Sequence, residues 1–274
     1  MSKNLLAICL SLILFPLSLI SGCGGGNAGK NSKDVNSTKY SKIIVIGIDE
    51  FAPMGFHNEK GEIVGFDVDL AKEAAKRMGV KVEFRPIEWN NKEQELESGN
   101  IDMIWNGLSV MPERKEKILY SKPYMENRQI LLVQKGNPKN IHALGDLEGK
   151  RVGTQAGSSA EAYINEDDFL RNSFAEFKIY QTINEGFVAL SKGEFDAMIT
   201  DEIAARYERS KHPDTFEIVE ATVGSIAEFA IGFSKNNTEL RDKVQKVFDE
   251  MFRDGTTKKI SEEWFQADLV KFGK

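Results

Sequence analysis

The sequence has 274 residues, of which 41% are hydrophobic and 28% charged, with a net charge of -6. This composition is typical of a soluble globular protein with room for two modest domains, and the acidic balance disfavours a nucleic-acid partner. The two cysteines, Cys9 and Cys23, both precede the predicted globular part. That part therefore has neither a disulfide framework nor a thiolate metal site, and the three histidines lack zinc-ligand spacing.

The N-terminus has the pattern of a secretory signal peptide. An apolar run over residues 5–20 follows Lys3 and ends at small residues just before Cys23. We expect the signal over residues 1–22, with an uncleaved signal anchor as the alternative. The letters ISGC that end at Cys23 resemble the lipobox of bacterial lipoproteins. This resemblance implies that Cys23 is lipidated and holds the protein on the cell membrane, outside the cytoplasm.

Residues 23–40 are rich in Gly, Asn, Ser and Lys and show no apolar periodicity, which predicts a flexible tether. Its glycines match both GxGxxG and GxxxxGK. No strand precedes them and no helix follows, so these matches do not predict a phosphate-binding loop.

Beyond residue 42, strand and helix patterns alternate along the chain. Apolar, β-branched runs predict strands over residues 43–48, 80–85, 101–105, 130–134, 150–153, 177–182, 195–200 and 228–233. Helical spacing predicts helices that begin near residues 67, 93, 160, 184, 202 and 239, with Thr238 as the cap of the last of these, and a final helix that ends near 265. Strand–helix–strand order implies parallel pairing, and it occurs twice. The sequence therefore predicts an α/β fold with two lobes, each a mostly parallel sheet flanked by helices.

Residues 101–114 (IDMIWNGLSVMPER) place a predicted strand directly before the start of a helix. Pro112 suits the first helical turn, and Gly107 and Ser109 lie at the junction with Arg114. Ligands of open α/β sheets bind at the carboxyl ends of strands, where helix N-termini donate to anions. An arginine fork can form two parallel hydrogen bonds with a carboxylate. This stretch therefore predicts carboxylate capture by Arg114, with a surface ion pair as the alternative.

Ordered motifs over residues 42–268 resemble a known family. They are IGIDEFAPM, GEIVGFDVDLAKEAAKRMGV, LESGNIDMIWNGLSVMPERKEKILYSKPYM, DLEGKRVGTQAGSSAE and LSKGEFDAMITDE. These motifs are similar to those of bacterial extracellular solute-binding proteins of polar-amino-acid ABC importers, which have the periplasmic-binding-protein-like II fold. The resemblance implies a two-strand hinge between the lobes and a membrane permease as partner. We expect a monomer that is not an enzyme and needs no cofactor.

The resemblance also implies that both ends of the chain build the same lobe. On this basis we expect lobe 1 to comprise residues 41–125 and 229–274, and lobe 2 to comprise residues 129–222. The two hinge segments are then residues 126–128 and 223–228.

Family binding roles carry over to nine positions. Arg114 matches the arginine that pairs with the ligand α-carboxylate, and Ser159 matches the second-lobe position that donates to the same group. Asp201 matches the acid that accepts from the α-ammonium, with a helix cap as the alternative. The other matches are Gly107 and Ser109, for backbone and hydroxyl contacts; Phe51, for stacking or else core packing; Asp49, for the ligand side chain or else a turn; and Asn106 and Gln155, for the walls.

Two acids predict the kind of ligand side chain that is bound. Asp49 and Glu50 favour a ligand with donor groups, such as glutamine or a basic amino acid, and cystine also fits.

Two other functions are alternatives to a transport receptor. One is a dehydratase-like enzyme that uses these two acids on a small carboxylate, and the other is a ligand-sensing module. No His or Cys stands at a candidate cleft position, which leaves little for nucleophilic catalysis. Trp105 and Asn106 replace residues that are small in many family members, which predicts a bulkier pocket wall.

Overall fold

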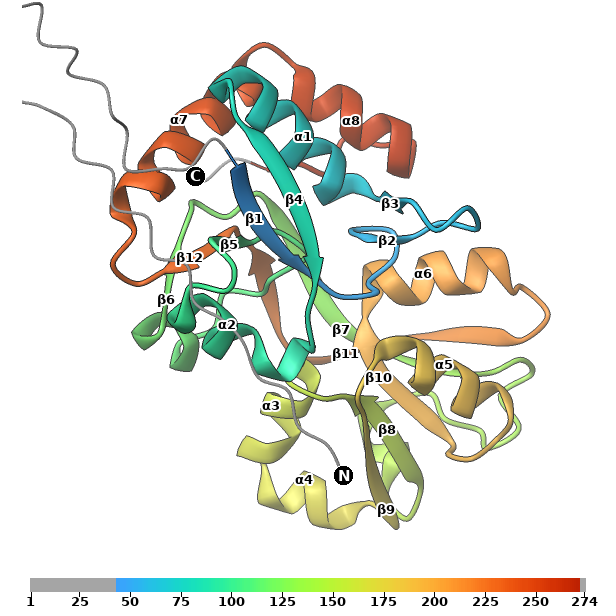
Figure 1. The fold of residues 1–274 in the computed structure, drawn as a ribbon. Coiled ribbons are helices and arrows are strands. Elements are labelled where there is room, and N and C mark those ends of the chain that lie inside the picture. Colours follow the sequence, from blue (N-terminus) through green and yellow to red (C-terminus); the bar gives the residue numbers. More distant parts are fainter. Residues whose placement is uncertain (1–42, 272–274) are drawn as a thin grey trace, which may run out of the picture. The chain divides into compact units, whose positions relative to one another are not determined.

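Residues 43–271 are described by the computed structural model shown in Figure 1. The predicted signal peptide, the tether and Cys23 lie outside the described residues. Within them, the chain forms two five-stranded sheets and a hairpin of β2 (Phe56–His57) and β3 (Ile63–Val64). The two-lobe α/β fold predicted from the sequence is confirmed.

The first lobe is built on one sheet. Its strand order is β4 (Lys81–Pro86), β1 (Ile43–Ile48), β5 (Met103–Ile104), β12 (Gly232–Ser234) and β6 (Ile118–Tyr120). β1 is parallel to β4 and β5, whereas β12 is antiparallel to both of its neighbours, so the sheet is mixed. Because β12 comes from late in the sequence, distant parts of the chain build this sheet together.

Helices cover the first sheet. They are α1 (Phe66–Met78), α2 (Lys92–Ser98), α7 (Thr238–Arg253) and α8 (Thr256–Phe265), with the 3-10 turns η1 (Trp89–Asn91) and η2 (Glu113–Glu116). α1, α7 and α8 lie together on one side of the sheet (Figure 1). α1 buries the apolar face that its periodicity predicted and ends at Gly79, whose φ of 68° reverses the chain.

The second lobe contains the other sheet. Its strand order is β11 (Phe216–Phe229), β7 (Met125–Gln134), β10 (Ala197–Asp201), β8 (Arg151–Gln155) and β9 (Glu176–Tyr180). β8 is parallel to β10 and β9, and β7 is antiparallel to β10 and β11. The helices are α3 (Ser159–Glu166), α4 (Asp168–Ser173), α5 (Ile183–Ser191) and α6 (Glu202–Lys211), with the 3-10 turn η3 (Leu144–Leu147).

Three local predictions are wrong. The predicted strand 228–233 is divided, because β11 pairs with β7 as far as Phe229 and β12 belongs to the first sheet. The helix expected after Pro112 is only the four-residue 3-10 turn η2. The cap of α7 is Asn237 and not Thr238, since the Asn237 side chain accepts from the backbone N–H of Leu240.

Two long antiparallel strands, β7 and β11, connect the lobes. Met125 pairs with Phe229 at the ends of these strands, and Phe229 also forms a bridge with Ser109 of the first lobe. The polypeptide thus passes twice between the lobes along neighbouring strands. The hinge limits at residues 126–128 and 223–228 stay a prediction.

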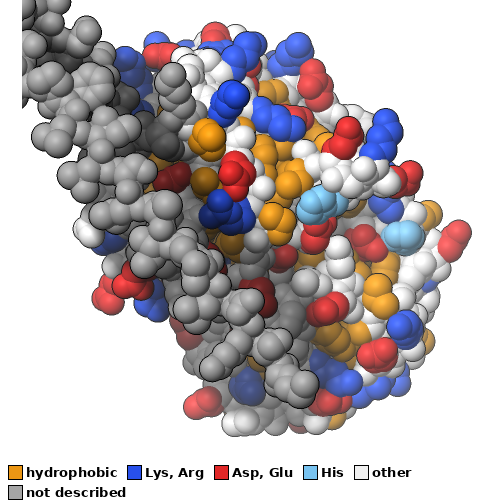
Figure 2. Space-filling view, viewed as in Figure 1, with side chains coloured by type: hydrophobic (Ala, Val, Ile, Leu, Met, Phe, Trp, Pro, Cys, Tyr) orange, Lys and Arg blue, Asp and Glu red, His pale blue; other side chains and the backbone are white. Residues whose placement is uncertain are grey.

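On the face drawn in Figure 2, acidic and basic side chains of the described residues are interspersed. No helix within residues 43–271 is both long enough and apolar enough to cross a bilayer. In the same part of the chain, no group of three or more His, Cys, Asp or Glu side chains is arranged to hold a metal ion.

Candidate ligand-binding site

One cavity between the lobes is lined by all nine residues that the sequence predicted for ligand binding. Its lining residues are Asp49, Phe51, Trp89, Asn106, Gly107, Ser109, Arg114, Gln155, Ser158, Ser159 and Asp201. Many of them follow or end a strand, because the carboxyl ends of parallel strands meet at one edge of each sheet.

Arg114 reaches the cavity from η2 and is only 6% exposed, so the alternative of a surface ion pair is wrong. Its Nη2 donates to the carbonyl oxygen of Gly157 at 2.8 Å, and its Nη1 donates to that of Ser109 at 3.3 Å. Among residues 43–271, the carboxylate that pairs with it is that of Glu93, whose Oε1 lies 3.6 Å from Nε. Neutral carbonyls therefore hold much of the guanidinium, which leaves its charge available to an anion in the cavity.

Asp201 ends β10 on the second-lobe side of the cavity. Its Oδ1 accepts from Gln129 Nε2 at 2.7 Å and from Asn127 Nδ2. The carboxylate makes no capping bond to α6, so the helix-cap alternative is wrong. Burial raises the pKa of Asp201, and hydrogen bonds from the two amides oppose this shift.

Sequence reasoning missed Asn127 and Gln129. Both lie on β7 and, being two residues apart, face the same side of the sheet. The predicted strand began at residue 130, because the polar residues before it show no apolar alternation. The two amide side chains, two residues apart just before this strand, were the sequence signal from which these positions could have been predicted.

Asp49 lies just beyond β1 and meets the second lobe through Gln155, whose Nε2 donates to Asp49 Oδ2 at 2.5 Å. The backbone N–H of Asp49 donates to Asn106 Oδ1 at 2.8 Å, so Asn106 also fixes the position of the acid. Burial raises the pKa of the Asp49 carboxyl. Glu50 is not among the lining residues and instead contacts His57.

Phe51 and Gly107 form a tightly packed corner of the cavity. The Phe51 ring packs edge-on against Phe229, with centroids 6.4 Å apart. Gly107 has a φ of 63°, and a Cβ there would lie 2.4 Å from the Phe51 ring, so only glycine fits. Its N–H donates to the buried Asp67 Oδ2 at 2.7 Å. The hydroxyl of Tyr124 also donates to this carboxylate, and burial raises the pKa of Asp67 to about 7.

Two lining residues were not predicted as site residues. Trp89 follows β4, so the strand-end rule that located the others could have found it. Ser158 caps α3 by accepting from the backbone N–H of Glu161 at 3.1 Å. Trp105, by contrast, is fully buried against Phe248 and does not line the cavity.

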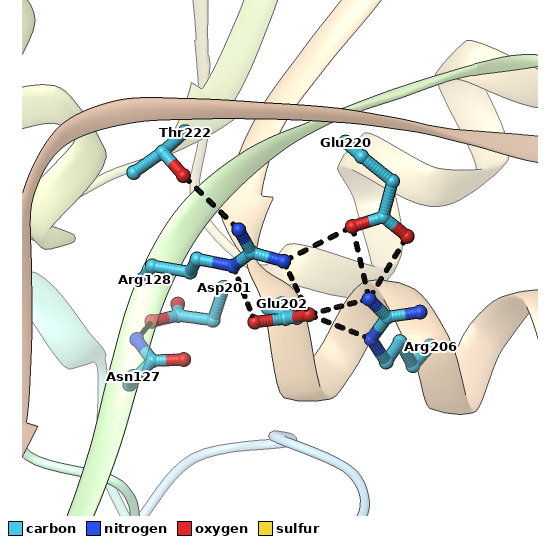
Figure 3. Close-up of polar contacts among 7 residues, drawn as sticks. All are labelled: Asn127, Arg128, Asp201, Glu202, Arg206, Glu220 and Thr222. Atoms are coloured by element: carbon cyan, nitrogen blue, oxygen red, sulfur yellow. Dashed lines mark hydrogen bonds and ion pairs between the residues drawn. The ribbon is translucent and has the colours of Figure 1, made fainter.

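A network of charges lies beside Asp201 (Figure 3). Arg128 of β7 bonds to Glu202 of α6, with Nε 2.7 Å from Oε2, and to Glu220 of β11, with Nη2 3.0 Å from Oε2. Arg206 bonds to the same two carboxylates. The network ties the first turn of α6 to both connecting strands and so holds the end of β10, where Asp201 lies.

Residues 43–267 match the family model of bacterial extracellular solute-binding proteins, family 3. The chain belongs to this family.

This solute-binding protein is similar to several relatives. The sequence is 30% identical to that of the L-cystine-binding protein TcyJ of Escherichia coli (strain K12), over 86% of this chain and 88% of that protein. It is 37% identical to a solved substrate-binding protein of an ABC uptake transporter from Streptococcus pneumoniae with bound histidine. There the TM-score is 0.79, over 84% of this chain and 95% of that one. An ancestral arginine-binding protein bound to glutamine is 38% identical, with a TM-score of 0.76, over 82% of this chain and 99% of that one.

Proposed function

We propose that this solute-binding protein is the receptor of an ABC amino-acid importer. It captures a free polar amino acid in the cavity between the lobes and delivers it to the membrane permease. The observation that carries the proposal is that Arg114 and Asp201 line one cavity from opposite lobes. A zwitterion has one anionic and one cationic end, and these two side chains offer a complementary charge to each.

In this proposal Arg114 pairs with the α-carboxylate, and Ser109 and Ser159 donate hydroxyl hydrogen bonds to it. Asp201 accepts from the α-ammonium. Each lobe alone provides only part of these contacts, so the amino acid favours the closed arrangement, in which all are made at once. Phe51 and Gly107 shape the wall on which the ligand rests.

The ligand side chain then lies near Asp49 and Gln155, with Trp89 as an aromatic wall. A buried carboxylate and a neighbouring amide favour a side chain with hydrogen-bond donors, such as that of glutamine or a basic amino acid. Cystine also fits this description, because its distal ammonium is a donor. The names of the related proteins cover cystine, histidine, arginine and glutamine, which agrees with this range.

We further propose that residues 1–22 are removed and that a lipid on Cys23 holds a monomer on the outer side of the cell membrane. One acyl chain binds a membrane only marginally, so stable anchoring calls for multiple acylation of this cysteine. We propose that the protein acts as a binder and not as an enzyme. Of the two acids that the sequence offered for catalysis, Asp49 lines the cavity, whereas Glu50 contacts His57 and does not.

A thermal-shift screen against the twenty amino acids and cystine tests the binding function. We expect one or a few polar amino acids to raise the melting temperature, because a ligand that binds only the folded state stabilises it. Deaminated analogues of these ligands should raise it less. Asp201→Asn should weaken the amino acid far more than its analogue, measured by calorimetry. A chain that none of these compounds stabilises, or equal losses for both compounds in Asp201→Asn, would contradict the proposal.

A further inference from the structure

Lys92, the first residue of α2, is a lysine buried between the lobes. Its side chain is 2% exposed, and its Nζ lies 5.0 Å from the centroid of the Trp89 ring. Nζ donates to the carbonyl oxygen of Trp89 in its own lobe at 3.0 Å and to that of Gly157 in the second lobe at 2.9 Å. The hydrogen bond to Gly157 therefore crosses the cleft and depends on the closed arrangement.

The turn that Lys92 contacts carries cavity residues. Gly157 precedes Ser158 and Ser159, and its N–H donates to Glu161 Oε2 at 2.6 Å. A Cβ on Gly157 would lie 2.7 Å from the Cα of Asn90, so the turn rests directly on the first lobe. Holding the Gly157 carbonyl thus fixes the position of the two serines at the start of α3.

An ammonium group is costly to bury against neutral acceptors. The nearest carboxylate is that of Glu93, whose Oε1 is 3.8 Å from Nζ, and Arg114 brings a second positive charge to the same carbonyl. When the lobes separate, Nζ loses its second-lobe acceptor and water can replace it. Closure therefore moves this amine from water into a dry site beside another cation.

We propose that Lys92 is a positioning residue that latches the Gly157 turn onto the first lobe and gives up a proton to the solvent when the lobes close. This inference rests on the proposed amino-acid-binding function. Burial, reinforced by the charge of Arg114, lowers the pKa of Lys92 to about 7, whereas the charges of Glu93 and Glu161 act in the opposite direction. Lys92 lines a groove at the surface, and the remaining charged side chains that line it are those of Glu113 and Lys117.

Calorimetry in two buffers of different ionisation enthalpy counts the protons released on binding. L-arginine, L-histidine, L-glutamine and L-cystine are titrated at pH 7.5 into the wild type, Lys92→Met and Lys117→Met. Lys117 is the matched control, because it is exposed on the same groove and bonds to no second-lobe carbonyl among the described residues. We expect the wild type and Lys117→Met to release up to about one proton more than Lys92→Met. Asp49 and Asp201 are common to all three proteins, so their own proton exchange cancels in this difference. Equal numbers of released protons in all three proteins would contradict the proposal that Lys92 gives up a proton when the lobes close.

Two further measurements separate this inference from the binding function. Lys92→Arg keeps a charge that cannot be shed and should release no proton from this position. Small-angle scattering of the ligand-free protein at pH 6 and pH 8.5 should give a smaller radius at the higher pH for the wild type but not for Lys92→Met. If no amino acid binds the wild type, the proposed function fails and scattering alone decides the latch. A wild-type radius that is independent of pH would overturn it.

Discussion

Gln129 donates its side-chain amide to Asp201 over 2.7 Å from β7, one of the two strands that connect the lobes. The same Nε2 lies 2.9 Å from Ser159 Oγ. One buried amide therefore links the group that we assign to the ligand ammonium with a group that we assign to its carboxylate. The two ends of the proposed zwitterion site are thus coupled within the second lobe.

Gln129→Leu should weaken amino-acid binding about tenfold or more, because it removes a hydrogen bond to a charged group and frees Asp201 to turn away. The deaminated analogue should lose less. Calorimetry with both compounds measures the two losses. Gln134→Leu is the control, since Gln134 is on the same strand but donates to Ser191, away from the cavity. A tenfold loss in Gln134→Leu as well would point to general damage to the strand.

Arg114→Ala should weaken amino-acid binding by at least about a hundredfold, because a buried charged partner of the α-carboxylate is lost. Calorimetry gives the affinity, and a thermal melt checks that the protein still folds. Arg85→Ala removes an exposed arginine that donates to the backbone of Asn100 and should bind as the wild type does. Unchanged affinity in Arg114→Ala would remove the central assignment.

Gly107→Ala should destabilise the protein and weaken binding, because the new Cβ would lie 2.4 Å from the Phe51 ring. Gly79→Ala separates this clash from backbone strain, since Gly79 has a similar φ of 68° but no atom within 4 Å of a new Cβ. The control should cost about 1–2 kcal/mol in the free energy of unfolding and leave binding intact. Urea unfolding and calorimetry measure both. Equal effects of the two substitutions would show that the contact with Phe51 has no role.

Asp67→Asn should change the pH dependence of stability. Burial raises the pKa of Asp67 to about 7, so the folded state resists ionisation while the unfolded state ionises near its ordinary value. Wild-type stability is therefore greatest below the unfolded pKa and falls as the pH rises toward about 7, by up to about 4 kcal/mol. Asn cannot ionise and should remove the Asp67 contribution to this fall, whereas the contributions of Asp49 and Asp201 remain. Urea unfolding between pH 4.5 and 7.5 measures the slope, and Asp69→Asn, in the same helical turn, should keep it.

The sequence alone was enough for the two-lobe fold and for the residues at strand ends. Apolar runs mark the strands, and the architecture of a parallel sheet gathers their carboxyl ends. The resemblance of the ordered motifs to a known family, and not this rule, predicted that Arg114 and Asp201 share one cleft between the lobes. The roles of the other predicted binding residues also came from these ordered motifs. Periodicity also located α1 and its stop at Gly79, because both depend on local backbone preferences.

Only the tertiary structure decided which polar groups are buried together. Gln129 meets Asp201 across 72 positions in the sequence, and Lys92 meets Gly157 across 65. Asp67 has the pattern of an ordinary acid in a first helical turn, yet it is fully buried. Local patterns record which face of an element is apolar, but a polar residue becomes buried only when a distant partner satisfies it, and that partner is fixed by the packing of the two lobes.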